Sequence, residues 1–396
     1  MNFLILSLIK AAIVAFVLMT ALAYLQWIER KVIAHIQLRV GPYRVGPHGL
    51  LQPLADVIKL ITKEGVIPSH VNKFFYILAP WIAVVLALIS ISVIPFGPEI
   101  DVFGVKTWMQ LTDLNIGILF VLAVSSVGVY GVALAGWASN NKYSLLGGLR
   151  SSAQMISYEL PLALAIAAPL LLANTLSFRE IVNYQSGYWL GFIPKWNVFP
   201  EFVGFAVFVI AGFAETNRVP FDLPEAENEL VAGFHVEYAS MKFASFFMAE
   251  YANMVTVTCV ATLLFLGGWT PPFPAPASNI VPIAIFALAG AIALFHGLHP
   301  ARRLDRFTLP VTALVAFGLA GLFAISFLVP VVETILMALF WFCAKVGILL
   351  FLFIWVRGTS PRFRYDQLMR FAWTFLFPLG MLNLLVTSLV VALTSK

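Results

Sequence analysis

Four ionisable residues lie inside long apolar stretches of the chain: Glu159, Glu215, Glu250 and Lys345. On membrane-insertion scales such a residue costs about 2.5 to 3.5 kcal/mol, so these positions are candidates for function. Glu159 and Glu250 follow the starts of their stretches at similar distances, and Glu215 ends its own stretch. The three carboxylates would then share one layer away from bulk water, which suits a proton relay. The alternative is that each glutamate only bonds to a neighbouring helix.

The chain from Glu215 to Glu250 is strongly acidic. Its basic residues are Arg218 and Lys242, and its seven acidic residues are Glu215, Asp222, Glu225, Glu227, Glu229, Glu237 and Glu250. Glu225 and Glu227 follow a proline that suits a helix start, where acidic side chains favour the positive end of the helix dipole. The remaining charge needs basic partners or protons, unless the segment is simply a solvated acidic surface.

The cysteines and histidines do not form a recognisable metal-binding pattern. Cys259 and Cys343 stand alone in apolar stretches, and the six histidines show no ligand spacing. This pattern predicts neither a disulfide framework nor a zinc or iron-sulfur site. We therefore expect no metal, FMN or Fe-S cluster on this chain, and any electron carrier would belong to a partner.

The elements that position these residues follow from composition. Of the 396 residues 61% are hydrophobic and 11% are charged, whereas a soluble domain has about 25% charged residues. Backbone groups in lipid must be satisfied internally, so apolar runs of roughly 20 residues predict membrane helices. We expect an all-α polytopic membrane protein with about ten transmembrane helices. The runs are 4–28, 74–95, 115–137, 153–173, 198–215, 243–268, 280–298, 308–329, 332–356 and 369–393.

The basic residues predict the orientation of these spans. Eighteen of the 24 lysines and arginines fall in the connections after the first, third, fifth, seventh and ninth runs. By the positive-inside rule these connections are cytoplasmic, and both termini lie outside. Glu29-Arg30-Lys31 follows the first run as a stop-transfer cluster, so we expect this run to remain as a membrane helix and not to be a cleaved signal peptide.

Residues 50–64 are too polar to cross the bilayer but have an amphipathic helical pattern. The apolar face carries Leu50, Leu54, Ile58 and Ile61, and the polar face carries Gln52, Asp56, Lys59 and Lys63. This pattern predicts a helix lying at the cytoplasmic membrane surface. A pure lipid anchor would prefer a basic polar face, so the helix either anchors to lipid or lines a cavity through Asp56.

Four strings carry a family resemblance. They are GPYRVGPHGLLQPLADVIKLITKE (41–64), AGWASNNKYSLLGGLRSSAQMISYE (135–159), AETNRVPFDLPEAENELVAGFHVEY (214–238) and RGTSPRFRYDQLM (357–369). They closely resemble the H subunit of the bacterial proton-translocating NADH-quinone oxidoreductase, the respiratory complex I subunit equivalent to mitochondrial NADH dehydrogenase subunit 1. The resemblance covers residues 5–270 and 332–393. It implies a multi-pass subunit of a translocase in the bacterial cytoplasmic (inner) membrane, with no redox centre of its own.

The resemblance also implies sites and partners. The substrate would be a quinone, either ubiquinone or menaquinone, in a chamber completed by peripheral subunits, one of which carries the terminal Fe-S cluster. Further partners would be neighbouring membrane subunits and the lipid bilayer, with no nucleic acid. The implied quinone-chamber residues are Arg30, Gln37, Arg39, Asp56, Phe243, Phe247 and Arg357. The implied proton-coupling residues are Glu159, Glu215, Glu225, Glu227, Glu229, Glu237 and Glu250.

The chain departs from the family pattern in one region. Family members usually have eight spans, and residues 280–330 look like an added pair of helices. We therefore expect a membrane core over 1–279, with its interfacial helix at 50–64 and an acidic cytoplasmic loop at 216–242, then a peripheral hairpin over 280–330 and the last two core spans over 331–396. If the hairpin packs across the quinone entrance, the usual access route cannot apply.

Three other functions compete with the implied one. The equivalent membrane subunit of a membrane-bound hydrogenase would carry related motifs. A secondary ion transporter would use the buried glutamates and lysine, but it should show internal repeats and discontinuous spans in matched halves, which we do not find. A structural anchor would have no quinone path of its own.

Overall fold

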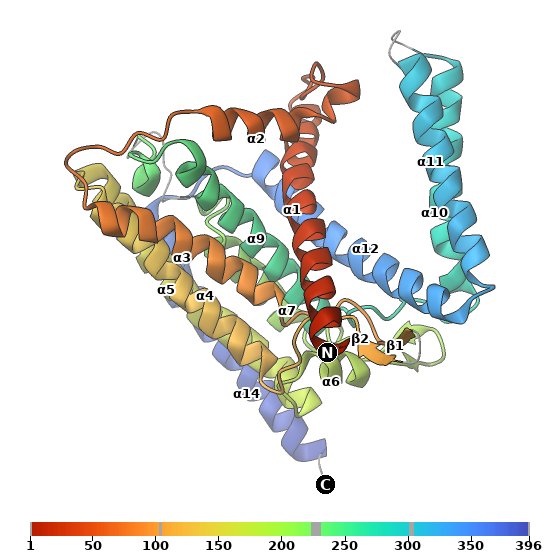
Figure 1. Ribbon diagram of the computed structural model, residues 1–396. Coiled ribbons are helices and arrows are strands. Elements are labelled where there is room, and N and C mark those ends of the chain that lie inside the picture. Colours follow the sequence, from red (N-terminus) through yellow and green to blue (C-terminus); the bar gives the residue numbers. More distant parts are fainter. Residues whose placement is uncertain (1, 103–104, 223–230, 301–304, 395–396) are drawn as a thin grey trace.

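The chain folds into a bundle of long tilted helices, and the computed structural model describes residues 2–102, 105–222, 231–300 and 305–394 (Figure 1). Within these residues, nine helices are long and apolar enough to cross a membrane. The all-α polytopic class is therefore confirmed. The helices are α1 Asn2–Ile36, α3 Lys73–Ile91, α4 Gly117–Ala138, α5 Lys142–Ala173, α9 Ser240–Phe265, α10 Ala277–Leu298, α11 Asp305–Ser326, α12 Pro330–Thr359 and a final helix, Tyr365–Thr394.

The final helix has three parts: α13 Tyr365–Phe371, a π-helical turn η3 Ala372–Leu376, and α14 Phe377–Thr394. The fifth of the ten expected spans, 198–215, forms only the helix α7 Phe202–Glu215. Its 14 residues rise about 21 Å, less than the ~30 Å of a hydrocarbon core. Thus the count of ten full-length spans is not confirmed within the described residues.

The remaining elements are short and lie at the helix ends. They are η1 Pro47–Gly49, α2 Gln52–Thr62, α6 Phe178–Tyr184, η2 Gly233–His235, and two antiparallel strand pairs, β1 Glu99–Val102 with β2 Val105–Trp108 and β3 Tyr188–Trp189 with β4 Ile193–Pro194. In the first pair Glu99 lies opposite Trp108. Figure 1 shows α2 across one end of α1, with β1, β2 and α6 towards the other end.

The core of the bundle is built by α3, α4, α5, α7 and α9. Small residues let these helices approach closely, as is usual when membrane helices pack. A Cβ on Gly136 of α4 would lie 3.0 Å from the Cα of Gly148 on α5, so both positions need glycine for this contact. The polar residues that the core encloses are therefore held between closely packed backbones.

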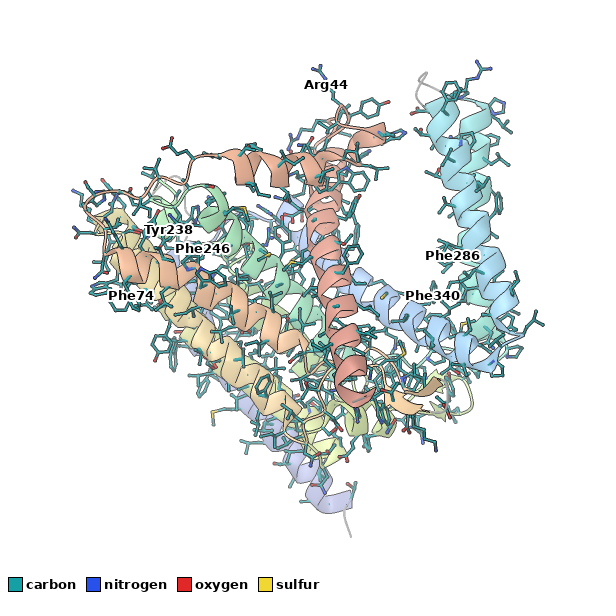
Figure 2. All side chains as sticks on the ribbon, in the orientation of Figure 1. Arg44, Phe74, Tyr238, Phe246, Phe286 and Phe340 are labelled. Carbon is teal, nitrogen blue, oxygen red and sulfur yellow. The ribbon has the colours of Figure 1, made fainter. Side chains whose placement is uncertain are left out.

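The helices α10 and α11 pack on each other and stand beside the bundle, joined to it at one end through α12 (Figure 1). At that end Phe286, Phe323 and Phe340 form an aromatic cluster between the three helices, and Figure 2 labels two of them. At the opposite end the His48 Nε2 atom lies 2.7 Å from the Thr308 Oγ1 atom. The hairpin is thus tied at both ends, at one of them to the connection between α1 and α2.

Candidate functional site

Two adjoining cavities lie inside the bundle. The larger encloses about 730 Å³ including its mouth, and the smaller encloses about 470 Å³. The two share four polar lining residues: Ser90, Ser125, Glu215 and Asn253. The larger cavity is also lined by Asn217, His235, Phe247 and Glu250. A mainly apolar interior space with a few polar side chains on its wall therefore extends between α7 and α9.

Glu215 lies where the two cavities meet, at the last residue of α7. Its Oε2 atom is buried and accepts no hydrogen bond from the described residues. The Glu159 carboxylate on α5 is close enough to interact electrostatically with Glu215, and it accepts a hydrogen bond from Ser126 on α4. Glu250 lines the larger cavity together with Glu215. The fold thus brings together the three carboxylates that the sequence placed in one layer.

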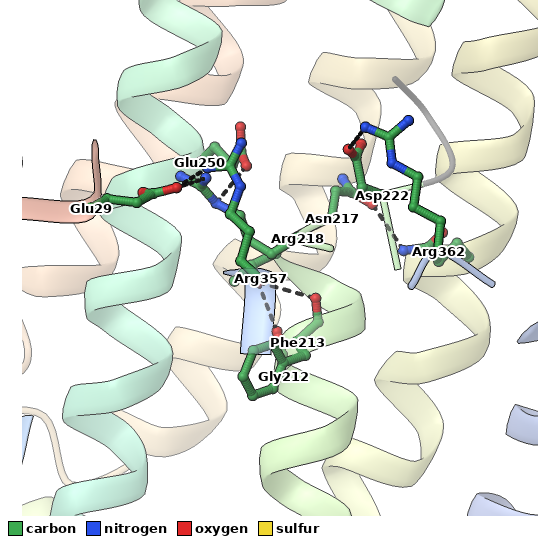
Figure 3. Close-up of polar contacts among 11 residues, drawn as sticks. Glu29, Gly212, Phe213, Asn217, Arg218, Asp222, Glu250, Arg357 and Arg362 are labelled. Atoms are coloured by element: carbon green, nitrogen blue, oxygen red, sulfur yellow. Dashed lines mark hydrogen bonds and ion pairs between the residues drawn. The ribbon is translucent and has the colours of Figure 1, made fainter. Parts of the chain in front are cut away.

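A buried ion-pair network adjoins the larger cavity (Figure 3). Arg218 contacts Glu250 through Nε at 2.7 Å and Glu29 through Nη1 at 3.2 Å. Glu29 also accepts a bond from Arg357 on α12. The side chains of Glu29 and Arg218 are only 4% and 5% exposed. The network therefore joins α1, α9, α12 and the loop after α7.

The turn that carries Arg218 is fixed from α5. Gln154, which is fully buried, donates hydrogen bonds to the carbonyls of Ala214 and Phe221, each at 2.8 Å. The Arg218 guanidinium then lies over the Tyr251 ring, 4.2 Å from its centroid. Two arginines and two glutamates balance in formal charge, which is what a buried network requires.

Two members of this network, Glu29 and Arg218, were not among the predicted site residues. Glu29 was expected only as part of a stop-transfer cluster, although it directly follows an apolar run. Arg218 was noted only as a basic residue in an acidic stretch. That isolation was a usable signal, because a single arginine among acids at a span end is a natural partner for buried carboxylates.

The implied quinone-chamber residues separate into two groups. The first group consists of two contacting pairs. Arg30 Nη1 lies 2.7 Å from Asp56 Oδ2, which joins α1 to α2. Arg39 Nε donates a hydrogen bond of 2.7 Å to Gln37 Oε1. None of these four lines either large cavity. The second group contains Arg357, in the network above, and Phe243 and Phe247 on α9, whose ring centroids are 4.6 Å apart.

The helix α2 exposes its apolar side chains and turns its acidic residue to α1, and Asp56 lines neither cavity. Its apolar side chains Leu54, Ile58 and Ile61 are more than half exposed. Its acidic residue Asp56 instead turns to the protein and pairs with Arg30. The apolar face is available to lipid while the polar face contacts α1.

His235 was not among the predicted site residues. It ends the turn η2, is 8% exposed and lines the larger cavity. Its ring packs against Phe234, Phe243 and Phe247, with centroid distances of 5.0, 5.4 and 6.0 Å. Burial lowers the pKa of His235 to about 4, so the imidazole is neutral near pH 7.

Glu237, a further predicted proton-coupling residue, lies away from the cavities. Glu237 accepts a hydrogen bond from Asn141 at 2.8 Å, has His70 at 4.0 Å, and lines neither cavity. It ties together loops at the bundle end. Glu225, Glu227 and Glu229 lie outside the described residues.

Lys345 is held by backbone carbonyls. Its Nζ atom donates to the carbonyls of Leu266, Gly268 and Thr270 at 2.6, 2.9 and 2.6 Å, and it lies 4.2 Å from the centroid of Trp196. These carbonyls follow the end of α9, about 24 Å along the helix axis from Glu250. Lys345 therefore anchors the loop after α9 and is separate from the carboxylates.

The side chains offer little to a resident metal. Within the described parts of the chain, no group of three or more His, Cys, Asp or Glu residues could hold a metal ion. The polar lining of the cavities instead consists of carboxylates, amides, hydroxyls and one imidazole. Such groups exchange protons and order water.

Comparison with known proteins identifies the family of this chain. The NADH dehydrogenase family matches residues 9–388. An NADH-quinone oxidoreductase H subunit of Solibacter usitatus is 65% identical over 100% of this chain and 99% of its own length. The corresponding H subunit of Koribacter versatilis is 49% identical over 99% and 98%, and that of Protochlamydia amoebophila is 44% identical over 93% and 92%. The matches favour the oxidoreductase over the hydrogenase and transporter alternatives. The chain therefore belongs to the NADH dehydrogenase family, among the H subunits of NADH-quinone oxidoreductases.

Proposed function

We propose that this chain provides the quinone-access path and the first charge relay of an NADH-quinone oxidoreductase, and that it couples quinone reduction to proton translocation. One observation carries the proposal. The larger cavity brings Phe247, from the implied quinone chamber, together with Glu215 and Glu250, from the implied proton-coupling set. The names of the similar subunits supply the reaction class.

The chemistry requires both protons and a response to charge. A quinone takes up two electrons and two protons to form a quinol, and the electrons would come from the Fe-S cluster of a peripheral partner. A negatively charged intermediate near the cavity would favour protonated carboxylates through Coulomb interaction, which is strong away from bulk water. Glu159 and Glu215 interact electrostatically, so a charge change at one carboxylate would be felt by the other.

The arginine network offers a route for this response. Arg218 contacts Glu250, which lines the cavity, and also Glu29 on α1. When Glu250 takes up a proton, its attraction for Arg218 weakens, and the arginine shifts its pairing towards Glu29. The charge change at the cavity would then reach α1 and α12.

The assembly follows from the same proposal. The cytoplasmic ends of the helices, including α2, would dock the peripheral subunits, and other faces would contact neighbouring membrane subunits. The chain would lie in the bacterial inner membrane with both termini outside. The hairpin of α10 and α11 would remain peripheral, since its contacts are mainly with α12.

The variant Glu215→Gln tests the relay in the assembled complex. It removes the titratable group at the junction of the cavities and keeps the size of the side chain. We expect quinone-linked NADH oxidation to fall at least tenfold, while NADH oxidation by an artificial acceptor stays intact. Glu180→Gln is the matched control, because Glu180 on the short helix α6 lines neither cavity. Wild-type quinone-linked turnover and proton pumping in Glu215→Gln would remove this residue from the pathway.

The access path needs a separate test, because Glu215→Gln addresses only the relay. Asp56→Ala breaks the contact between α1 and α2. We expect the KM for quinone to rise with little change in the rate of artificial-acceptor reduction. Unchanged quinone kinetics in this variant would favour the structural-anchor alternative.

A further inference from the structure

The turn that carries His235 packs closely against α5. Gly147 of α5 lies directly against Gly233, and a Cβ on Gly147 would be 2.7 Å from the Gly233 Cα atom. The neighbouring Ser144 donates a hydrogen bond of 2.9 Å to the carbonyl of Phe234. Gly233 itself has a φ of +61°, a conformation that favours glycine. These contacts fix the backbone on the N-terminal side of His235.

His235 is associated with both sets of residues that the proposed function needs. Its ring contacts Phe243 and Phe247 of the implied quinone chamber. It also lines the same cavity as Glu215 and Glu250. It is the one imidazole on the described cavity wall, and more than nine-tenths of it is buried.

A buried imidazole at this place has a use that a phenyl ring lacks. A neutral imidazole has one N–H donor and one acceptor nitrogen, so it can accept a hydrogen bond from one neighbour and donate one to another. Among the described residues, the charged side chains on the cavity wall are Glu215 and Glu250, and Glu250 pairs with Arg218. The neutral form of His235 follows from its burial.

We propose that His235 is a positioning residue, which orders cavity water between the Phe243–Phe247 wall and the carboxylates of Glu215 and Glu250. This inference rests on the proposed function. It gives the imidazole no part in electron transfer. Its task is to hold a hydrogen-bonded path in place, so that protonation changes near the quinone reach the carboxylates.

The test compares variants of His235 in the assembled complex. His235→Phe keeps an aromatic ring against the three phenylalanines and removes both nitrogen atoms, whereas His235→Asn keeps a donor and an acceptor. We expect His235→Phe to lower the kcat of quinone-linked turnover about tenfold with an unchanged quinone KM and intact artificial-acceptor activity. His235→Asn should restore the kcat to within about threefold of wild type. If His235→Phe does not assemble, His235→Leu takes its place.

Two results would overturn the inference. The ring nitrogens have no role if His235→Phe turns over like the wild type. A purely structural role holds if His235→Asn is as impaired as His235→Phe, or if both change the KM instead of the kcat. Glu215→Gln, measured under the same conditions, separates the two proposals. If Glu215→Gln loses quinone-linked turnover and His235→Phe does not, only the role of His235 is refuted. Wild-type rates in both variants would refute the proposed relay as well.

Discussion

The buried network around Glu29 gives a prediction whose size can be worked from the structure. Glu29→Gln removes the carboxylate that Arg218 and Arg357 share. Breaking a buried ion pair costs about 3 to 5 kcal/mol, because a charge is left without a partner. Arg218 keeps Glu250, and Arg357 is 33% exposed and can reach water. We therefore expect Glu29→Gln to lower the free energy of unfolding by about 3 kcal/mol, the low end of this range.

The neighbouring position supplies the control. Arg30→Gln breaks the contact with Asp56, in which the two side chains are 43% and 22% exposed. Ion pairs this accessible contribute about 0.2 to 1 kcal/mol. The assay is denaturant unfolding of the full chain in detergent, followed by tryptophan fluorescence, with the free energy of unfolding extrapolated linearly. If Glu29→Gln costs no more than Arg30→Gln, the network is solvated and the reasoning is wrong.

Three further predictions use the same unfolding assay. Lys345→Met leaves three carbonyls, one buried and two partly buried, without their donor. It should lower the free energy of unfolding by about 2 kcal/mol, and an unchanged value would refute the anchoring role. Gly147→Ala forces a Cβ onto the Gly233 backbone and should cost about 1 to 3 kcal/mol. The control Gly128→Ala meets nothing within 4 Å and should be neutral or stabilising, so equal effects would contradict the packing argument. His235 has a folded pKa of about 4 and an unfolded pKa near 6.5, so between these values the unfolded chain binds more protons and stability falls as the pH is lowered. Between pH 7 and pH 5 the free energy of unfolding should fall by about 2 kcal/mol less in His235→Phe than in the wild type. An equal fall in both proteins would refute the lowered pKa of His235.

The class of the protein could be predicted from the amino-acid sequence. Apolar run length and the need to satisfy the backbone in lipid leave little choice but helices, and α1, α3, α4 and α9 appear close to where the runs lie. Run length also overestimated one element, because residues 198–201 extend the apolar run to span length but α7 begins only at Phe202.

Tertiary structure alone decided which charged groups are partners. Glu29 and Arg357 are more than 300 residues apart in the sequence and become neighbours only because α1 packs on α12. Lys345, equally buried by sequence criteria, goes to three carbonyls and not to a carboxylate. Hydropathy reports how deep a side chain lies along its own helix. It carries no information about how the helix is rotated or which helix lies beside it, and those two quantities select each buried charge's partner.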